Sequence, residues 1–319
     1  MKVVNFLRGA LTLAITVALL LFTVSCDDPT EKPSADEVTF TDALGEVVTV
    51  SRKPKRVAAL LGSFADVWVL SGGELCAAAE DAWEDFDLEL GGAVNLGGAH
   101  SPSLELLVAS DPDFVIASAS TASNVEMRDT LISMGIAVAY FDVDSFDDYL
   151  DMLGICTSIT EREDLYEING LRLKTEIDNI KETYTDENIP TEERRILLLR
   201  AATGFVKAKG SAGTVLGEML ADMGCINIAD SDVSLLDNLS VEAVIREEPY
   251  HVFVVAMGSD TDKALASFEN MIKENPAWST LRAISEGRLH VMDKSLFNLK
   301  PNDRWAQAYG ILYEKLTEK

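Results

Sequence analysis

The residues able to carry out chemistry are few in this chain and lie far apart. Its three histidines, His100, His251 and His290, are scattered, and no C-x-x-C or H-E-x-x-H motif gives ligands at the spacing of a zinc site. No G-x-S-x-G motif marks a nucleophilic serine, and the stretch 204–213 lacks the Gly-Lys-Ser/Thr end of a phosphate-binding loop. The sequence therefore predicts neither a catalytic site nor a metal site, and it favours ligand binding over catalysis.

Aromatic and cationic side chains gather in segments expected to follow buried strands. Ligands of open α/β sheets bind beyond the carboxyl ends of the strands, so these segments should line a cleft. Flat aromatic surfaces with a few cations suit a large, partly apolar anion. The expected ligand-binding residues are Ser63, Phe64, Trp83, His100, Ser120, Arg200, Phe205, Lys207, Met257, Lys294, Phe297 and Arg304, with Lys209 and Lys300 as further cations.

Three other polar or aromatic residues have a structural explanation. His251 directly precedes a buried strand, His290 lies inside one, and Trp305 belongs to the apolar face of the last helix, so all three are expected in the core. His100 and Met257 could instead face each other across the cleft as axial ligands of haem, which leaves haem open as an alternative ligand.

Two glutamates occupy matched positions in the chain. In residues 103–116 and again in residues 240–255, Ser-x-Glu is followed after six residues by a proline and then by a strand. In each copy the serine suits the N-cap of a short helix, and the glutamate falls in the first turn, where the helix dipole favours negative charge. The identical spacing predicts two equivalent helices that present Glu105 and Glu242.

The elements that position these residues are arranged in two similar halves. Alternating residues at 38–50 predict a hairpin, and the apolar run 56–61 followed by a helix that closes at Gly72 predicts a β/α unit. The same plan recurs in the second half, where a buried strand from residue 195 precedes a helix expected at 211–223.

A long charged stretch separates the halves. Apolar residues recur every three to five positions between residues 161 and 186, which predicts an amphipathic helix about 38 Å long. The sequence thus predicts an α/β protein with two Rossmann-like lobes joined by a single long α-helix, a stiff hinge that should permit only small closure motions. The expected boundaries are a signal peptide at 1–25, a lipidated tether at 26–37, an N-terminal lobe at 38–160, the interlobe helix at 161–187 and a C-terminal lobe at 188–319.

Over almost all of the chain after the tether, the sequence resembles the siderophore- and cobalamin-binding proteins of ABC importers. The resemblance rests on the hairpin 41–50 with the following Lys53-Pro54-Lys55-Arg56-Val57, on the two Ser-x-Glu helices, on Gly217-Glu218-Met219-Leu220 and on the ending 276–292. It implies a class III periplasmic binding protein fold with the ligand between the lobes. It also implies that one glutamate from each lobe, here Glu105 and Glu242, docks onto arginines of the permease dimer.

The resemblance implies transport and no enzymatic activity. The expected function is to capture an iron-siderophore complex and deliver it to the permease and ATPase subunits of an ABC importer, without a resident cofactor. Cobalamin and haem are the alternative ligands. A metal-chelatase-like enzyme and a ligand sensor that does not transport are the alternatives from other classes, and the matched glutamates argue against the sensor, which would not need them.

The N-terminus predicts the location of the protein. Lys2 and Arg8 precede an apolar run that ends at Val24, and Cys26 follows the small residue Ser25, as in bacterial lipoproteins that are acylated on cysteine. The run is shorter than the roughly 20 residues of a spanning helix. We therefore expect a protein on the extracytoplasmic face of the cell membrane that contacts the membrane only through a lipid on Cys26.

The charge of the chain excludes one class of partner. Without residues 1–25 it carries 25 basic and 53 acidic residues, a net charge of −28. Nucleic-acid binding requires basic patches, so a nucleic-acid partner is not expected, and the charge favours a soluble monomer. Cys76, Cys156 and Cys225 stand among apolar neighbours and are expected to be buried thiols.

Overall fold

The computed structural model of the protein describes residues 35–258 and 260–318. The predicted signal peptide and Cys26 lie outside these residues. None of the helices in the described part of the chain is long and apolar enough to cross a membrane.

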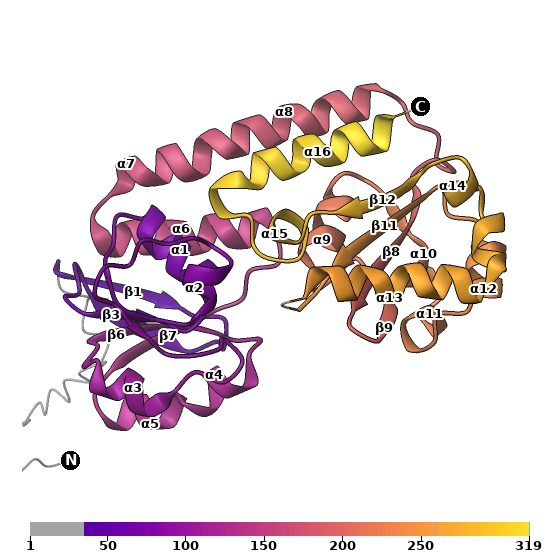
Figure 1. Ribbon diagram of the computed structural model, residues 1–319. Helices are drawn as coiled ribbons and strands as arrows, with labels where there is room; N and C mark the ends of the chain where they lie inside the picture. The colour runs from indigo at the N-terminus through magenta and orange to yellow at the C-terminus, as the bar shows by residue number, and fades with distance from the viewer. Residues whose placement is uncertain (1–34, 259, 319) are drawn as a thin grey trace, which may run out of the picture. The chain divides into compact units, whose positions relative to one another are not determined.

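Five parallel strands form the N-terminal sheet in the order β5-β4-β3-β6-β7. They are β3 (Val57–Ala59), β4 (Leu75–Ala78), β5 (Val94–Asn95), β6 (Phe114–Ser118) and β7 (Ala137–Phe141). Figure 1 shows helices on both sides of this sheet. Both faces are covered because a parallel sheet must be buried on both sides. One face carries α1 (Gly62–Leu70), α2 (Asp81–Glu84) and α6 (Phe146–Thr160), and the other carries α3 (Leu104–Ala109), α4 (Ala122–Glu126) and α5 (Arg128–Ser133).

The predicted N-terminal hairpin is confirmed as β1 (Glu37–Thr41) paired antiparallel with β2 (Val47–Ser51). Its turn is held by Asp42, whose Oδ1 accepts hydrogen bonds of 3.0 Å from the backbone N–H groups of Leu44 and Glu46. The other carboxylate oxygen accepts from the N–H of Tyr140 on β7 at 3.2 Å. One buried carboxylate therefore shapes the turn and fixes the hairpin to the sheet.

The C-terminal sheet contains parallel strands in the order β10-β8-β11-β12, and β9 is paired antiparallel with β8. These are β8 (Arg195–Ala202), β9 (Phe205–Lys209), β10 (Ile226–Asn227), β11 (His251–Ala256) and β12 (Leu289–Met292). One face packs against α9 (Val215–Asp222) and α16 (Trp305–Thr317). The other packs against α10 (Ile228–Ser231), α11 (Ser234–Asp237), α12 (Val241–Glu247), α13 (Thr261–Glu274), η2 (Pro276–Thr280) and α14 (Arg282–Ser285). We refer to each sheet with its helices as a lobe.

Two expectations for the second lobe are wrong in detail. Residues 200–209, expected to follow a strand, instead continue β8 and return as β9. The helix expected from residue 211 begins at Val215, because Gly213 has a φ of +73° and the Thr214 hydroxyl caps the helix by accepting a 3.2 Å hydrogen bond from the Gly217 N–H. The chain reverses at this glycine, and the helix can start only after it.

The repeated Ser-x-Glu pattern is confirmed as a structural repeat. Ser103 caps α3 and Ser240 caps α12, each by accepting a 3.3 Å hydrogen bond from a backbone N–H in the first turn. Each helix is followed by a residue in the left-handed conformation directly before the proline, Asp111 with φ 48° and Glu248 with φ 46°. The chain then enters β6 or β11, the strand beside β3 or β8. The two lobes therefore share a local plan down to single backbone angles.

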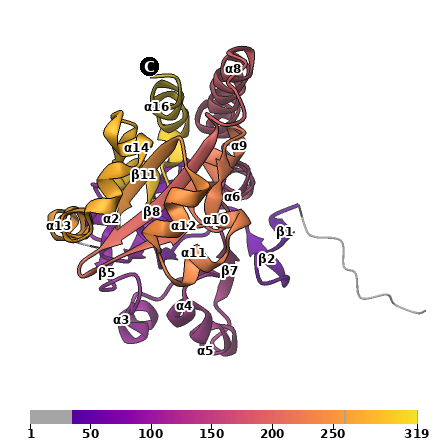
Figure 2. The ribbon, with the colours of Figure 1, turned by 90° about the vertical axis from the view of Figure 1, so that its right-hand side faces the viewer.

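The lobes are connected by a long helix, as predicted. α7 (Glu163–Tyr166), the π-helical turn η1 (Glu167–Leu171) and α8 (Arg172–Asp186) follow one another without a break. α16 lies along α8, as the two views in Figure 1 and Figure 2 show. Gly170 in the π-helical turn allows a close approach to α6, since a Cβ there would lie 3.0 Å from a methyl group of Leu150. Among the described residues, this helix is one of two connections between the lobes.

A second connection runs through residues 293–304, which we call the crossing segment. It contains α15 (Lys294–Phe297) and η3 (Asn302–Arg304), and it joins β12 of the second lobe to α16. The fully buried Asn302 donates hydrogen bonds through Nδ2 to the carbonyl oxygen of Ser63 at 2.9 Å and to Oδ2 of Asp66 at 2.7 Å, both on α1. The crossing segment thereby anchors the end of the chain on the first lobe.

Replacing Asp66 by asparagine is expected to stabilise the protein at neutral pH. Burial raises the pKa of Asp66 to about 6, although the hydrogen bond from Asn302 opposes this. Because the pKa of Asp66 is higher in the folded than in the unfolded protein, the free energy of unfolding falls as pH rises from about 4 to about 6. Above pH 6 the carboxylate is charged in both states, and the cost of burying that charge is at its full value. Asparagine keeps an acceptor for Asn302 without the charge. Urea unfolding at pH 7 should show a gain of about 1–2 kcal/mol that shrinks near pH 4, while the exposed Asp87→Asn should show none. A loss of stability in Asp66→Asn at pH 7 would contradict this account.

Candidate functional site

A cavity of about 710 Å³ lies between the two lobes, beside the carboxyl ends of their central strands. In the first lobe its lining comes from the loops after all five strands of the sheet. In the second lobe it comes from β8 and from the residues before α9 and after β11, and the crossing segment completes it. This is the position at which open α/β sheets bind ligands. Six of the twelve residues expected to bind ligand line it: Ser63, His100, Ser120, Arg200, Met257 and Lys294.

The other six do not line the cavity, and the side chains of three of them pack in or against the hydrophobic core. Phe64 and Phe297 are each 1% exposed and pack inside the hydrophobic core, so neither offers a surface to a ligand. Trp83 is half-buried and packs against the same core. Each of these residues is a neighbour in sequence of cavity-lining residues. Its position on its helix, however, directs its side chain toward the sheet.

The remaining three lie on the surface. Arg304 is exposed in η3. Phe205 and Lys207 lie on β9, with the lysine ammonium 5.7 Å from the phenyl centroid, and they line a different hollow that also includes Glu242. Because residues 200–209 form a hairpin, β9 extends away from the cavity. These three residues are therefore not part of the cavity wall.

The β8–β9 hairpin concentrates positive charge on one face. Arg200 of β8 pairs in register with Lys207 of β9, and Lys209 follows on the same face two residues later. None of the three forms an ion pair with a carboxylate in the described part of the chain. Burial lowers the pKa of Arg200, and burial together with the two neighbouring cations lowers the pKa of Lys209. Like charges opposite each other destabilise a sheet, so this face is arranged to receive an anion.

The crossing segment brings two more cations to the cavity, and each forms an ion pair with the first lobe. Lys294 Nζ lies 2.9 Å from Oδ1 of Asp85, and Lys300 Nζ lies 3.7 Å from Oδ1 of Asp144. All four side chains line the cavity. These pairs hold the crossing segment against the first lobe at the edge of the cavity. Among the described residues Arg200 is the cavity cation that forms no ion pair, although the more distant Asp144 carboxylate partly offsets the effect of burial on its pKa.

The first lobe contributes acidic residues that the sequence interpretation did not select. Glu80, Asp81 and Glu84, in and just before α2, line the cavity. Asp81 Oδ2 accepts a 2.8 Å hydrogen bond from the N–H of Gly62, where a Cβ would lie 2.6 Å from the backbone of residues 81 and 82. The signal that could have found them was the acidic run after Ala79, which follows a buried strand as the cationic segments do.

Two of the three histidines and Trp305 lie in the core, and the third histidine lies at the cavity. His251 and His290 are buried in β11 and β12, at 1% and 7% exposure, and Trp305 is fully buried, as expected. His100 and Met257 line the cavity from the first and second lobe respectively. No group of three or more histidine, cysteine, aspartate or glutamate side chains in the described part of the chain is placed to hold a metal ion.

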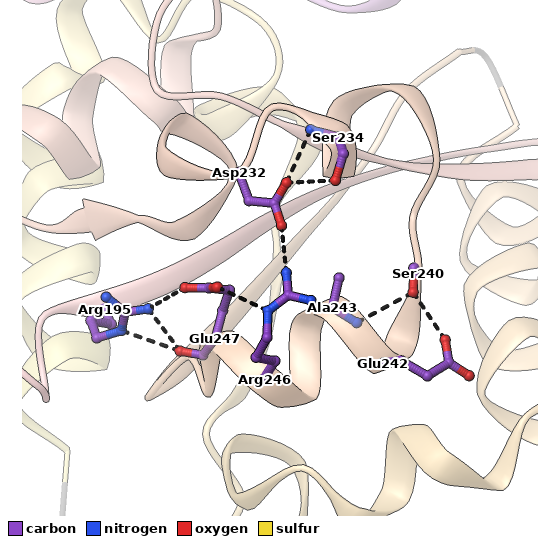
Figure 3. A network of polar contacts seen from close by, with 8 residues as sticks. All are labelled: Arg195, Asp232, Ser234, Ser240, Glu242, Ala243, Arg246 and Glu247. Carbon is purple, nitrogen blue, oxygen red and sulfur yellow. Dashed lines mark hydrogen bonds and ion pairs between the residues drawn. The ribbon is translucent and has the colours of Figure 1, made fainter.

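The matched glutamates are both exposed and both lie outside the cavity lining. Figure 3 shows the second of them at the start of α12, where Glu242 Oε2 accepts a 2.9 Å hydrogen bond from the Ser240 hydroxyl. Bonds to its own backbone and to this hydroxyl lower the pKa of Glu242. Further along the helix, Arg246 pairs with Asp232 at 2.7 Å. α3 presents Glu105 in the corresponding place on the first lobe.

Comparison with known proteins connects this fold to one family. Residues 57–296 match the periplasmic binding protein family. The chain is 24% identical over 275 residues to the Fe(3+)-citrate-binding protein YfmC of Bacillus subtilis, covering 85% of this chain and 81% of that protein. It is 22% identical over 307 residues to the putative ABC transporter substrate-binding lipoprotein YhfQ of the same organism, covering 91% and 92% of the two chains. Staphylococcus aureus SirA complexed with staphyloferrin B superposes with a TM-score of 0.69 at 20% identity, covering 88% of this chain and 98% of that one.

Proposed function

Because the chain belongs to the periplasmic binding protein family, we propose that it captures a ferric siderophore complex outside the cytoplasm and delivers it to an ABC importer. The observation that carries the ligand class is Arg200, a cation in the wall of the interlobe cavity that forms no ion pair among the described residues, in a chain with a net charge of −26. Lys207 and Lys209 of β9 extend the positive charge of this face beyond the cavity. Ferric complexes of citrate and of other carboxylate-rich chelators are anions, and this face supplies the opposite charge. The similarity to a protein named for binding ferric citrate supports the same class.

Transport would proceed by binding and docking, without chemistry on the ligand. The ligand enters the cavity, the lobes close by a small angle about α8, and the closed form docks on the permease dimer through Glu105 and Glu242. ATP hydrolysis on the cytoplasmic side supplies the energy. A lipid on Cys26 would keep the protein at the membrane, and the similarity to a protein named as a lipoprotein supports this anchor.

Replacing Arg200 by glutamine is expected to weaken binding of a ferric citrate-type chelate about 10- to 100-fold. A charge-assisted hydrogen bond to a guanidinium contributes about 1.5–3 kcal/mol, and glutamine keeps polarity without the charge. The measurement is titration calorimetry, with the exposed Lys273→Gln on α13 as the matched loss of one positive charge. Equal affinity in wild type and Arg200→Gln would contradict the assignment.

The proposed function is tested by native mass spectrometry of residues 27–319, alone and with ferric siderophores, cobalamin and haem. One-to-one binding of a ferric siderophore is the expected result. Selective binding of cobalamin or haem would keep the transport function and change the ligand. If well-folded protein bound none of them, a ligand sensor or an enzyme on this fold would replace the proposal.

Haem is the second candidate ligand because one observation favours it. His100 and Met257 line the same cavity from opposite lobes, which is the arrangement that two axial ligands require. Haem titration followed by absorbance spectroscopy distinguishes the two candidates. A bound haem whose Soret spectrum changes in both His100→Ala and Met257→Ala would support haem, whereas a spectrum insensitive to both would reject axial ligation.

A further inference from the structure

The walls of the interlobe cavity carry opposite charges. The second lobe contributes Arg200, and the crossing segment contributes two lysines, whereas the first lobe contributes Glu80, Asp81 and Glu84. We call these three residues the acidic wall. A ligand that is only an anion would be attracted to one side of this cavity and repelled by the other.

The acidic wall has no cationic partner of its own. The cavity lysine Lys294 is already paired with Asp85 at 2.9 Å, one residue beyond the end of α2. None of Glu80, Asp81 and Glu84 forms an ion pair with another described residue. Burial and the neighbouring Asp85 raise the pKa of Asp81, which means that a cation at this position would be favourable, although His100 nearby acts in the opposite direction.

Two buried polar atoms beside the acidic wall lack hydrogen-bond partners within the described part of the chain. One is Oδ1 of Asp81, whose other oxygen is held by Gly62. The other is Oγ of Ser63, a cavity-lining residue that is only 3% exposed. A buried polar atom without a partner costs about 1–3 kcal/mol, so such atoms at a cavity are expected to bond to the ligand.

The acidic wall is not arranged for a metal ion. Metal ions require several oxygen or nitrogen ligands that converge on one point, and no such group of three occurs among the described residues. The three carboxylates are instead spread along one turn of chain, from the residue before the short helix α2 to the end of that helix. An extended set of carboxylates suits a group with several N–H donors, such as an ammonium or amidinium group.

We infer that the ligand carries a protonated amine or amidine in addition to its anionic metal-chelating part, and that this cation lies against Glu80, Asp81 and Glu84. The anionic part faces Arg200 across the cavity. Ser63 supplies a hydroxyl to the cationic end. This inference rests on the proposed function, since it divides the class of ferric chelates into those with and without a free amine.

The test uses two synthetic ferric citrate-hydroxamate chelates that differ only in one group, a free primary amine in the first and the same amine acetylated in the second. Titration of residues 27–319 at pH 7 should show roughly 10-fold tighter binding of the free amine. In Glu80→Gln/Asp81→Asn/Glu84→Gln this preference should disappear while affinity for the acetylated chelate is kept. Asparagine at position 81 retains the acceptor for Gly62, and the milder Glu80→Gln/Glu84→Gln should show a partial loss of the preference.

The control is Glu89→Gln, an exposed acidic residue of the same region that does not line the cavity, and it should keep the full preference. Equal binding of the two chelates by the wild-type protein, or a preference that survives in the triple variant, would overturn the inference about the amine and leave the proposed function intact. If neither chelate bound, the proposed ferric-chelate function would fail and the inference with it.

Discussion

Replacing Glu105 and Glu242 together by lysine is expected to reduce ligand uptake to background while ligand affinity stays within about twofold of wild type. Both glutamates are exposed, both begin N-capped helices at matched places in the two lobes, and neither lines the cavity. Two equivalent carboxylates, one on each lobe, suit a dimeric partner with two equivalent cationic sites. Placing like charges at such an interface costs several kcal/mol of docking free energy.

Uptake is measured with radiolabelled ferric chelate in vesicles that contain the cognate permease and ATPase, and affinity by calorimetry. The control is Glu176→Lys/Glu314→Lys, which reverses two exposed charges on α8 and α16 and should transport normally. The single variants should each show an intermediate defect. Normal uptake by the double variant at Glu105 and Glu242 would reject the docking assignment and favour the sensor.

The protein is expected to lose about 2–3 kcal/mol of stability between pH 7 and pH 5, because one pair of histidines removes about 3–4 kcal/mol and the opposing Asp66 returns about 1 kcal/mol. His251 Nδ1 and His290 Nε2 lie 3.0 Å apart, and one ring must donate while the other accepts. Burial and the neighbouring Arg288 lower the pKa of His251 to about 3 and contribute to lowering that of His290 to about 4. Since both folded values are below the ordinary value near 6.5, the unfolded chain binds the extra protons, and stability falls as pH drops below about 6.5.

Urea unfolding at pH 7 and pH 5 measures this loss. In His251→Phe/His290→Leu the loss should shrink to about 1 kcal/mol or less, because both imidazoles are removed together and neither ring is left without its partner. The exposed third histidine gives the control, and His100→Gln should lose as much stability as wild type. Asp66 and Asp81, whose pKa values are raised, oppose the effect in all variants alike. Unchanged pH dependence in the double variant would contradict the assignment.

Much of the fold could be predicted because its signals are local. The hairpin at 38–50, the buried strands and the amphipathic interlobe helix each follow from the period of apolar residues, and the two Ser-x-Glu copies follow from capping chemistry. The crossing segment could not be predicted in this way. Its attachment to α1 depends on one buried amide, Asn302, and on contacts between residues more than 230 positions apart, for which a single sequence has no signal.

The cavity was predicted less well than the fold. Residues that directly follow a strand are expected near the carboxyl edge of a sheet. This rule correctly places four residues at the cavity, namely Ser63, Ser120, Arg200 and Met257. Position after a strand does not decide which way a side chain points once a helix has begun, and the side chains of Phe64 and Phe297 belong to the core. The acidic wall also follows a strand, but its residues do not stand out in so acidic a chain.

The position of Trp305 has a consequence for the order in which the chain can fold. Its fully buried indole packs 6.0 Å from the ring of Phe146 and 6.5 Å from that of Tyr149, both on α6 of the first lobe. The last helix thus completes a core that begins with residues synthesised far earlier. When the chain emerges from a ribosome or a translocation channel, the first lobe has its strands but not this final layer. We therefore expect the lobe to remain loosely packed, and dependent on protection from aggregation, until α16 is released.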